Sequence, residues 1–497
     1  MKRAVIAVTL ICLISLMAVL FIPCLEASGE EWLNVALTSN PVAKIPSDIE
    51  DFASGFVLQN NVYECLVRHS REKKLIEPGL ATEWHVERKG KEWVFRIREG
   101  VLFHDGTIMT ADDVVQAFRS SDYYKGEIRT EGDLRVRFIL PEKRAEFIKS
   151  LSMIQYSIFK KDAEGNLVGT GPFYVDSWDP DDRVVLRAFD SYWNGEVKLD
   201  GAVYFCGLKA DEAVRRMRKG EIDLIDTVPH SMADEIAADD KLILSELQGA
   251  NLSFVHLNIN NSPLDRPEFR KALNMAINKE KIIRDIYYGH ALKSYSLHPT
   301  IREKNKKDDY IQIKYNPDKA RDIISRFTGG ESIVFRFIGL PVPRPYCPDP
   351  NAQARLVAGY LKGVGVKVRY YQPATMKEYI EIVQSGSYDL MLCGWVIESY
   401  NPDDFYVRVL GTEYGLSIFG VNWSDMIFNS MITNARKTIS LKKQWEFYMT
   451  AEKIFFDECP WIILAHVNRI FAYRNEVRGL DLTSNFELRI FDVYKKE

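Results

Sequence analysis

Between residues 267 and 392, helical and strand-like patterns follow one another in turn. Pro267 opens a segment in which Phe269, Ala272, Leu273 and Ala276 recur at helical spacing. The order predicted from here on is a helix from Pro267, a helix over 352–361, a strand over 366–370, a helix over 376–383 and a strand over 388–392. Since alternation of this kind builds a sheet with helices on its faces, we predict an α/β lobe.

The first half of the chain has a different pattern, in which strands dominate. Trp93, Phe95 and Ile97 alternate with polar or less apolar residues, which is typical of a half-buried strand. Thr110 is followed three positions later by Asp113, a capping-box spacing that predicts a helix start. Further strands are predicted over 134–140, 174–175 and 184–188. The chain therefore combines at least one α/β lobe with a strand-rich piece.

The N-terminus resembles a secretory signal. Lys2 and Arg3 precede an uncharged, mostly apolar run over 4–22, and small residues follow, which predicts cleavage near Ala27. The run is long enough to span a bilayer as a helix, so an uncleaved anchor remains the alternative. Lipid attachment at Cys24 is not expected, because the three residues before it are not small. We therefore expect the protein in the periplasm or on the outer face of the cell membrane.

Composition and charge exclude several classes of protein. The 497 residues suggest two to four domains, and 46% hydrophobic with 27% charged residues is the composition of a globular chain. With 65 Lys and Arg against 69 Asp and Glu, the net charge of −4 offers no basic field for a nucleic acid. An odd number of cysteines follows Ala27, so at least one thiol stays unpaired whatever the disulfides. The five are Cys65, Cys206, Cys347, Cys393 and Cys459.

No motif for catalysis was found. The sequence lacks GxSxG, HExxH, GxxxxGK[ST] and a GxGxxG after a strand, and its eight histidines are not at metal-ligand spacing. His104, beside the turn residue Gly106, is interpreted as a structural residue. We therefore expect no enzymatic activity, no cofactor and no metal site.

Several ordered motifs carry a resemblance. The stretches 77–84, 93–107 and 110–115 look like those of the extracytoplasmic solute-binding proteins of the peptide/nickel family. Further stretches match in the same order, at 169–173 with 190–193, at 220–223, at 258–278 and at 388–402. The resemblance spans nearly the whole chain after Ala27.

The resemblance implies a two-lobed α/β clamshell with an additional strand-rich subdomain inserted in the first lobe. The expected organisation is a signal peptide over 1–27, the first lobe over 28–60, 170–254 and 466–497, the inserted subdomain over 61–169, and the second lobe over 255–465.

The function that the resemblance implies is that of the substrate-binding receptor of an ABC-type importer. The expected partners are a small peptide ligand and a membrane permease complex, and the receptor itself is expected to be a monomer that binds no nucleic acid. Two alternatives stay open. The same fold can hold a metal chelate, haem, an oligosaccharide or an opine, or it can serve an enzyme or a ligand sensor.

Two charged residues are candidates for holding a peptide. Arg344, between Pro343 and Pro345, resembles the arginine that dipeptide-binding members present to the peptide carboxylate, and a guanidinium matches a carboxylate bidentately. Glu398 stands where peptide-binding relatives have an aspartate for the α-ammonium. The alternatives are a surface arginine in a proline loop and a solvated loop acid.

Aromatic residues flank both charges. Trp395, Tyr346 and Tyr400 are predicted to line the pocket and to give apolar area to ligand side chains. For Trp395, packing in the core of its lobe is an equally good interpretation.

Overall fold

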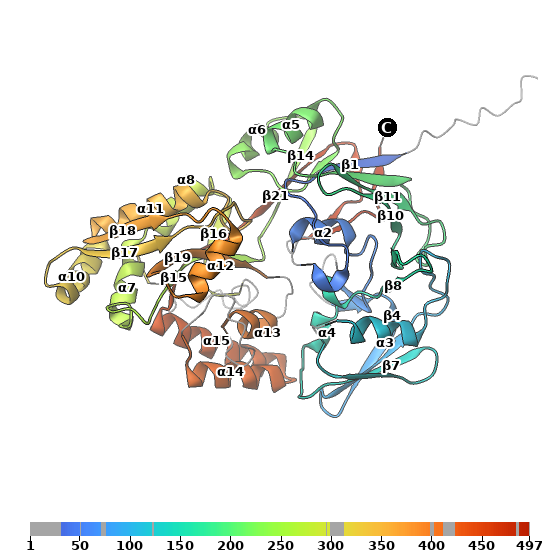
Figure 1. Cartoon of the computed structure of the whole chain (residues 1–497), viewed down its shortest axis with the longest axis horizontal. Coiled ribbons are helices and arrows are strands. Elements are labelled where there is room, and N and C mark those ends of the chain that lie inside the picture. Colours follow the sequence, from blue (N-terminus) through green and yellow to red (C-terminus); the bar gives the residue numbers. More distant parts are fainter. Residues whose placement is uncertain are drawn as a thin grey trace, which may run out of the picture.

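The structure is a computed structural model that describes residues 31–49, 51–70, 76–121, 124–294, 296–298, 313–397, 402–410, 423–483 and 487–496. Two lobes lie side by side, and the chain passes from one to the other (Figure 1). The apolar run over 4–22 lies outside the described residues. Within them, no helix has the length and apolar character needed to cross a bilayer.

The first lobe is built on a seven-stranded sheet. Its central strand β1 (Trp32–Ala36) pairs in parallel with β12 (Gly201–Phe205) and β13 (Leu224–Ile225). From edge to edge the order is β10 (Phe173–Trp178), β11 (Arg183–Ala188), β12, β1, β13, β21 (Arg469–Arg474) and β14 (Leu242–Leu247). Its core packs against α2 (Phe52–Leu58), α5 (Ala210–Arg218) and α6 (Ala233–Ala237). Because β21 lies near the end of the chain, the C-terminal segment completes this lobe.

A strand-rich subdomain is inserted into the first lobe and has its own apolar core. Its four-stranded sheet has the order β4 (Ala81–Glu87), β5 (Glu92–Ile97), β7 (Arg135–Ile139) and β6 (Glu127–Thr130), and α3 (Ala111–Arg119) packs on it. The ring of Phe138 lies 4.8 Å from that of Phe118 and 5.4 Å from that of Phe95. The predicted capping box is confirmed, since the Thr110 N–H donates to Asp113 at 2.7 Å and the Asp113 N–H donates to Thr110.

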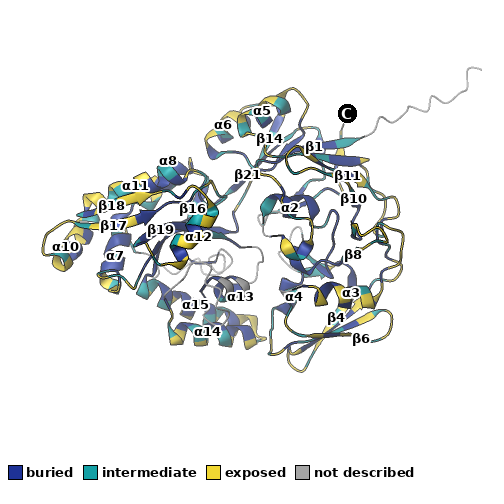
Figure 2. Ribbon diagram, viewed as in Figure 1, coloured by how far each residue is buried: buried dark blue, intermediate teal, exposed yellow. Residues whose placement is uncertain are grey.

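The second lobe contains a six-stranded sheet. Its order is β16 (Ala291–Lys293), β20 (Trp461–Val467), β15 (Asn251–Leu257), β19 (Leu390–Val396), β17 (Ile333–Ile338) and β18 (Val366–Tyr371). Its helices are α7 (Pro267–Ala276), α8 (Lys279–Ile286), α10 (Pro317–Thr328), α11 (Pro350–Gly363), α12 (Met376–Gln384), α13 (Pro402–Phe405), α14 (Met426–Lys437) and α15 (Leu441–Glu458). Figure 2 shows its strands largely buried and its helices exposed on their outer faces.

Short elements complete the two lobes. The paired short strands are β2 (Val67–His69) with β3 (Ile76–Pro78), β8 (Lys160–Lys161) with β9 (Leu167–Val168), β22 (Val477–Arg478) with β25 (Tyr494–Lys495), and β23 (Asp481–Leu482) with β24 (Leu488–Arg489). The remaining helical turns are α4 (Phe147–Ser150), η1 (Pro46–Asp48), η2 (Ile154–Tyr156), η3 (His230–Met232) and the π-helical η5 (Tyr406–Leu410).

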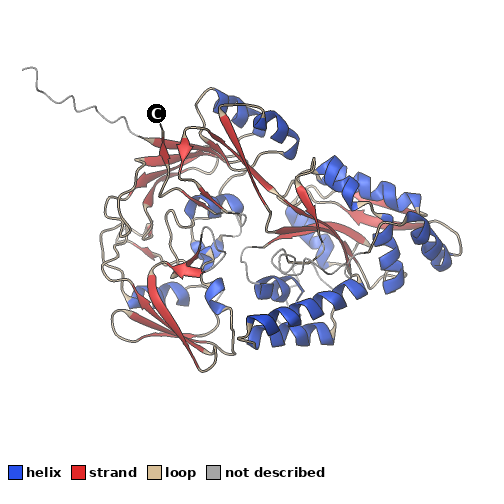
Figure 3. Cartoon of the chain, turned by 180° about the vertical axis from the view of Figure 1, so that it is seen from behind, coloured by secondary structure: helices blue, strands red, loops and turns tan. Residues whose placement is uncertain are grey.

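The chain crosses between the two large sheets twice. Residues 248–250 join β14 to β15, and Asn468 joins β20 to β21 (Figure 3). The two crossings are tied together, because the side-chain amide of Asn251 donates to the carbonyl of Val467 at 2.8 Å and accepts from its N–H at 2.9 Å. Two short crossings of this kind can act as a hinge between rigid lobes.

The structure confirms the two-lobed α/β fold with an inserted strand-rich subdomain, and most of the predicted elements of the second lobe. Helix α7 begins at Pro267, and α11, β18 and α12 cover their predicted segments. The strand predicted over 388–392 runs further, to Val396, because Gly394 and Trp395 continue the ladder opposite Ser253 and Leu252 of β15. All five described cysteines are free thiols.

Candidate functional site

The loop after β17 holds Arg344 in a tight turn. The N–H of Arg344 donates to the carbonyl of Cys347 at 3.0 Å, and the N–H of Cys347 donates to the carbonyl of Arg344 at 2.8 Å. Pro343 and Pro345 flank Arg344, and proline fixes the φ angle at its own position. The turn therefore presents Arg344 with little backbone freedom.

Tyr346 fastens this turn to β19. A Cβ atom at Gly394 would lie 2.2 Å from Cδ2 of Tyr346 and 2.5 Å from the carbonyl oxygen of Leu252, so the phenol packs where only glycine leaves room. Burial raises the pKa of the Tyr346 phenol above its usual value, and the nearby positive charge of Arg344 opposes part of this rise. Arg344, Tyr346 and Gly394 therefore lie close together.

Buried polar side chains lie beneath the turn. Tyr287 Oη is 3.2 Å from the carbonyl oxygen of Tyr346, 2.7 Å from Gln353 Oε1 and 3.1 Å from Ser253 Oγ. The amide of Gln353 donates to Ser253 Oγ at 3.0 Å, and the Cys347 thiol donates to Gln353 Oε1 at 3.3 Å. Because buried polar groups are costly to leave unpaired, this network specifies one position for the turn.

The half-buried Arg344 side chain has no carboxylate partner within the described part of the chain. A guanidinium stays charged at any physiological pH and presents a planar fork of donors. Such a group, held on a rigid turn, can bind the carboxylate of another molecule by donating two parallel hydrogen bonds to its oxygens.

The position of the turn in the sheet favours ligand binding. Strands β17 and β19 are parallel, so their carboxyl ends share one edge of the sheet. At the same edge β15 begins and β20 ends, which are the two points where the chain crosses from and to the first lobe. Ligands of α/β proteins bind preferentially outside the carboxyl ends of parallel strands.

Trp395 lies on β19 opposite Leu252 and is half-buried. Its side chain packs against the apolar core of the second lobe, so the packing role considered from the sequence is confirmed. Trp395 directly follows Gly394, against which Tyr346 packs. Its role toward a ligand stays a prediction.

Glu398 and Tyr400 lie outside the described residues. Ile397, directly before Glu398, is buried, and its N–H donates to the carbonyl of Ala250 at 2.7 Å. Residue 250 belongs to the first crossing between the lobes. Ile397, the last described residue before Glu398, therefore lies beside the first crossing between the lobes.

Tyr287, Ser253 and Gln353 were not among the residues predicted from the sequence. For Gln353 a signal exists, because it stands on the stripe of α11 that Val357 and Leu361 continue at spacings of four, and those residues are fully buried. A polar residue on an apolar stripe indicates a buried hydrogen-bonding role. Tyr287 and Ser253 have no comparable local signal.

His104 has the structural role that the sequence indicated. Its Nε2 lies 3.0 Å from the carbonyl oxygen of Gly171, and its Nδ1 accepts from the N–H of Gly169 at 3.3 Å. Burial lowers the pKa of His104 to about 4, so the ring is neutral at physiological pH.

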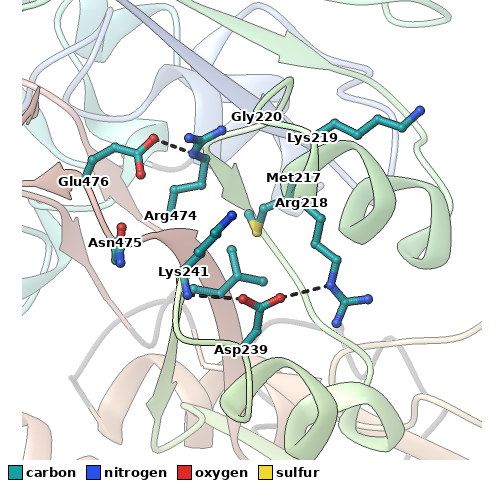
Figure 4. Close-up of a pocket in the computed structure, with 10 residues that line it drawn as sticks. Met217, Arg218, Lys219, Gly220, Asp239, Lys241, Arg474, Asn475 and Glu476 are labelled. Carbon is teal, nitrogen blue, oxygen red and sulfur yellow. Dashed lines mark hydrogen bonds and ion pairs between the residues drawn. The ribbon is translucent and has the colours of Figure 1, made fainter. Parts of the chain in front are cut away.

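A separate cavity of about 670 Å³ lies on the first lobe (Figure 4). Its charged lining residues largely satisfy one another, since Arg218 pairs with Asp239 at 3.1 Å and Arg474 pairs with Glu476 at 2.5 Å. Lys219 and Lys241 on its rim are exposed. These contacts indicate a structural role for the charges and single out no ligand.

Among the residues that the structure describes, no group of three or more His, Cys, Asp or Glu side chains is arranged to hold a metal ion.

Known proteins are similar to this chain over most of its length. A family model described as bacterial extracellular solute-binding proteins, family 5 Middle, matches residues 76–415. The dipeptide-binding protein of Escherichia coli is 28% identical over 469 residues, covering 84% of this chain and 86% of that protein. Heme-binding protein A of Haemophilus influenzae is 26% identical over 473 residues, covering 86% of this chain and 85% of that protein.

The fold is also found in solved structures. The dipeptide-binding protein from Pseudoalteromonas sp. SM9913, in complex with Met-Leu, matches with a TM-score of 0.82 at 22% sequence identity. The match covers 94% of this chain and 100% of that chain. At this identity the likeness establishes the two-lobed fold.

Proposed function

The chain belongs to the bacterial extracellular solute-binding proteins of family 5, and on this basis we propose that it is the substrate-binding receptor of an ABC-type importer for short peptides. In this proposal it captures a dipeptide or short oligopeptide between its two lobes and delivers it to a membrane permease complex. It acts outside the cytoplasmic membrane, as a monomer, and without catalysis, cofactor or nucleic acid.

The observation that carries the proposal is the Arg344 turn. A permanently charged guanidinium stands on a turn braced by two main-chain hydrogen bonds, at the sheet edge nearest the first lobe. The C-terminal carboxylate is a group that all unmodified linear peptides share. A fixed Arg344 therefore orients peptides by their main chain and leaves the identity of their side chains open.

The other proposed pocket residues are likewise divided between those that face the side chains of the peptide and one that holds its main chain. Tyr346 and Trp395, with Tyr400, supply apolar area to ligand side chains, and Glu398 receives the α-ammonium of the peptide. Glutamate is one methylene longer than the aspartate that the resemblance implies at this position, which allows a shifted ligand register or a different amine.

Capture proceeds by ligand-stabilised closure. The lobes are joined by two short crossings, so they can move as rigid bodies about a hinge. A peptide that contacts both lobes binds the closed form more tightly than the open form, and this difference in affinity shifts the population to the closed form.

A haem-binding relative of nearly equal coverage makes a non-peptide ligand the second candidate. The two candidates differ in their dependence on Arg344. A peptide carboxylate needs the guanidinium, whereas a ligand held mainly by apolar contacts does not.

The test begins with mass spectrometry of the small molecules released when the purified protein is denatured. A thermal-shift screen of dipeptides, tripeptides, haem and nickel chelates follows. A compound at one hundred times its dissociation constant stabilises the protein by about 2.7 kcal/mol, which such a screen detects. Short peptides that shift the melting temperature, with the shift lost in Arg344→Gln, support the proposal. A shift by haem or a chelate, but by no peptide, overturns it.

A further inference from the structure

Tyr287 is a fully buried side chain directly after α8, and its hydroxyl faces the Arg344 turn. The hydroxyl lies within hydrogen-bonding distance of the carbonyl of Tyr346, two residues after Arg344, and of Gln353 Oε1. Gln353 in turn accepts from the thiol of Cys347, which closes the turn with Arg344. Two successive residues of the turn, Tyr346 and Cys347, therefore depend on one small polar network.

The ring of Tyr287 faces the other way, toward the first lobe. It packs edge-to-face with His230, with ring centres 6.1 Å apart and an interplanar angle of 86°. His230 belongs to η3 of the first lobe, and its Nε2 lies 2.9 Å from the carbonyl oxygen of Asn468, the residue of the second crossing. The position of His230 is therefore set by the hinge.

A second contact fixes the same ring. His230 stacks on His290 of the second lobe, with ring centres 5.8 Å apart at 18°. His290 Nδ1 lies 3.0 Å from Glu246 Oε2, and the N–H of Asn468 donates to the carbonyl of His290 at 3.0 Å. Hinge rotation would change the packing of His230 against Tyr287, because the two rings belong to different lobes.

We propose that Tyr287 is a positioning residue for the carboxylate-binding Arg344: its hydroxyl fixes the Arg344 turn, and its ring, packed on His230, couples that turn to closure of the lobes. The inference rests on the proposed role of Arg344. In it, Tyr287 never touches the peptide, and its effect is confined to the part of the affinity that depends on the peptide carboxylate.

The experiment compares two ligands that differ only in this carboxylate. The dipeptide with the largest shift in the thermal screen and its C-terminal amide are titrated calorimetrically into the wild type and variants. The readout is the dissociation constant of the amide divided by that of the acid, which measures the preference for the free carboxylate. A role of Tyr287 in stability alone would change the melting temperature and both affinities while leaving this ratio unchanged.

Three variants separate the possibilities. Arg344→Gln is expected to abolish the preference for the acid, with a loss of about 30-fold or more in its affinity. Tyr287→Phe, which keeps the ring, is expected to lower the ratio about tenfold. Tyr192→Phe is the matched control, since it removes a buried hydroxyl that donates to Glu64 at 2.9 Å in the other lobe, and it should leave the ratio unchanged.

Two further measurements test the coupling. The double variant Tyr287→Phe, Arg344→Gln should show the same ratio as Arg344→Gln alone, because both changes act on one interaction. His230→Ala should lower the ratio, and His230→Phe, which restores a ring, should recover part of it.

The outcomes are distinguishable from those of the proposed function. If Arg344→Gln leaves the ratio unchanged, the proposed role of Arg344 fails, and this inference fails with it. If Arg344→Gln lowers the ratio while Tyr287→Phe does not, the inference alone is overturned. If Tyr287→Phe lowers the ratio but His230→Ala does not, the coupling to the lobes is overturned.

Discussion

The main-chain N–H of Ala145, in the inserted subdomain, donates to the carbonyl of Arg436 at the end of α14 at 3.0 Å. Glu142 of the same loop pairs with Arg436 at 3.2 Å and with Lys437 at 3.5 Å. In Figure 1 the end of α14 accordingly faces the inserted subdomain that contains α4. We call Glu142, Ala145, Arg436 and Lys437 the clasp. It joins the two lobes at a point away from the hinge, so the lobes are held together in this conformation.

Glu142→Gln is expected to weaken peptide binding a few-fold. The change removes both ion pairs of the clasp, one of them with the buried Arg436, and so costs the closed form about 1 kcal/mol. The open form, in which the clasp is broken, loses nothing. Calorimetric titration measures the affinity, and small-angle X-ray scattering of the ligand-free protein should show a larger radius of gyration.

Glu221→Gln is the control for the clasp, because Glu221 pairs with Arg216 at 3.0 Å within the first lobe. It should change neither the affinity nor the radius of gyration. Equal effects of the two substitutions would show that the clasp has no part in closure.

Gly394→Ala is expected to damage both stability and ligand binding. The new methyl group would overlap the ring of Tyr346 and the carbonyl oxygen of Leu252, both closer than 3 Å. Overpacking of a tight site costs about 1–3 kcal/mol, and relief by moving Tyr346 would displace the Arg344 turn. Thermal unfolding and peptide titration measure the two effects.

Gly359→Ala provides a matched control for this substitution. Gly359 lies in the interior of α11, and a Cβ there would meet no atom within 4 Å. The change should leave peptide affinity unchanged and raise stability by about 0.4–1 kcal/mol, since alanine favours the helix. Similar losses at both positions would contradict the packing described for Gly394.

Local patterns predicted individual helices and strands better than the site, and the two-lobed arrangement came from the resemblance. The helix starts at Thr110 and Pro267 follow from capping and from apolar spacing, which depend only on neighbouring residues. The resemblance, rather than any local pattern, pointed to Arg344 as a ligand contact. The partners of the site come from distant elements, as with Tyr287 and Gln353, and no local pattern links them. The residues of the clasp likewise come from distant parts of the chain, and no local pattern links them.

Reducing agent is expected to leave the melting temperature unchanged. The five described cysteines are free, and four of them are buried. Burial raises the pKa of Cys206 to about 11 and that of Cys65 to about 12, so the reactive thiolate is scarce at neutral pH. Alkylation of the native protein, followed by mass spectrometry, should label the half-buried Cys206 first. Loss of stability in dithiothreitol would reveal a disulfide and contradict these contacts.

The last prediction concerns Glu452, a fully buried carboxyl of α15. Its Oε1 accepts from the N–H of Leu297 at 2.7 Å and from the hydroxyl of Tyr406 at 2.6 Å, and burial raises its pKa to about 7. Because the pKa is higher in the folded than in the unfolded protein, the folded protein binds the proton more tightly. The neutral carboxyl therefore stabilises the fold fully below about pH 4.5, and this contribution of about 3 kcal/mol is lost as the pH rises to about 7.

Glu452→Gln keeps an oxygen acceptor for both donors and removes the titration. The difference in stability between the variant and the wild type should therefore shift in favour of the variant between pH 5 and pH 8, whatever its sign at pH 5. Unfolding followed by circular dichroism at several pH values measures this difference. The exposed Glu446 of the same helix is the control, and Glu446→Gln should show no such shift. A difference for Glu452→Gln that stays constant with pH would mean that the carboxyl is ionised across this range, because tight binding of the proton by the folded protein requires the shift.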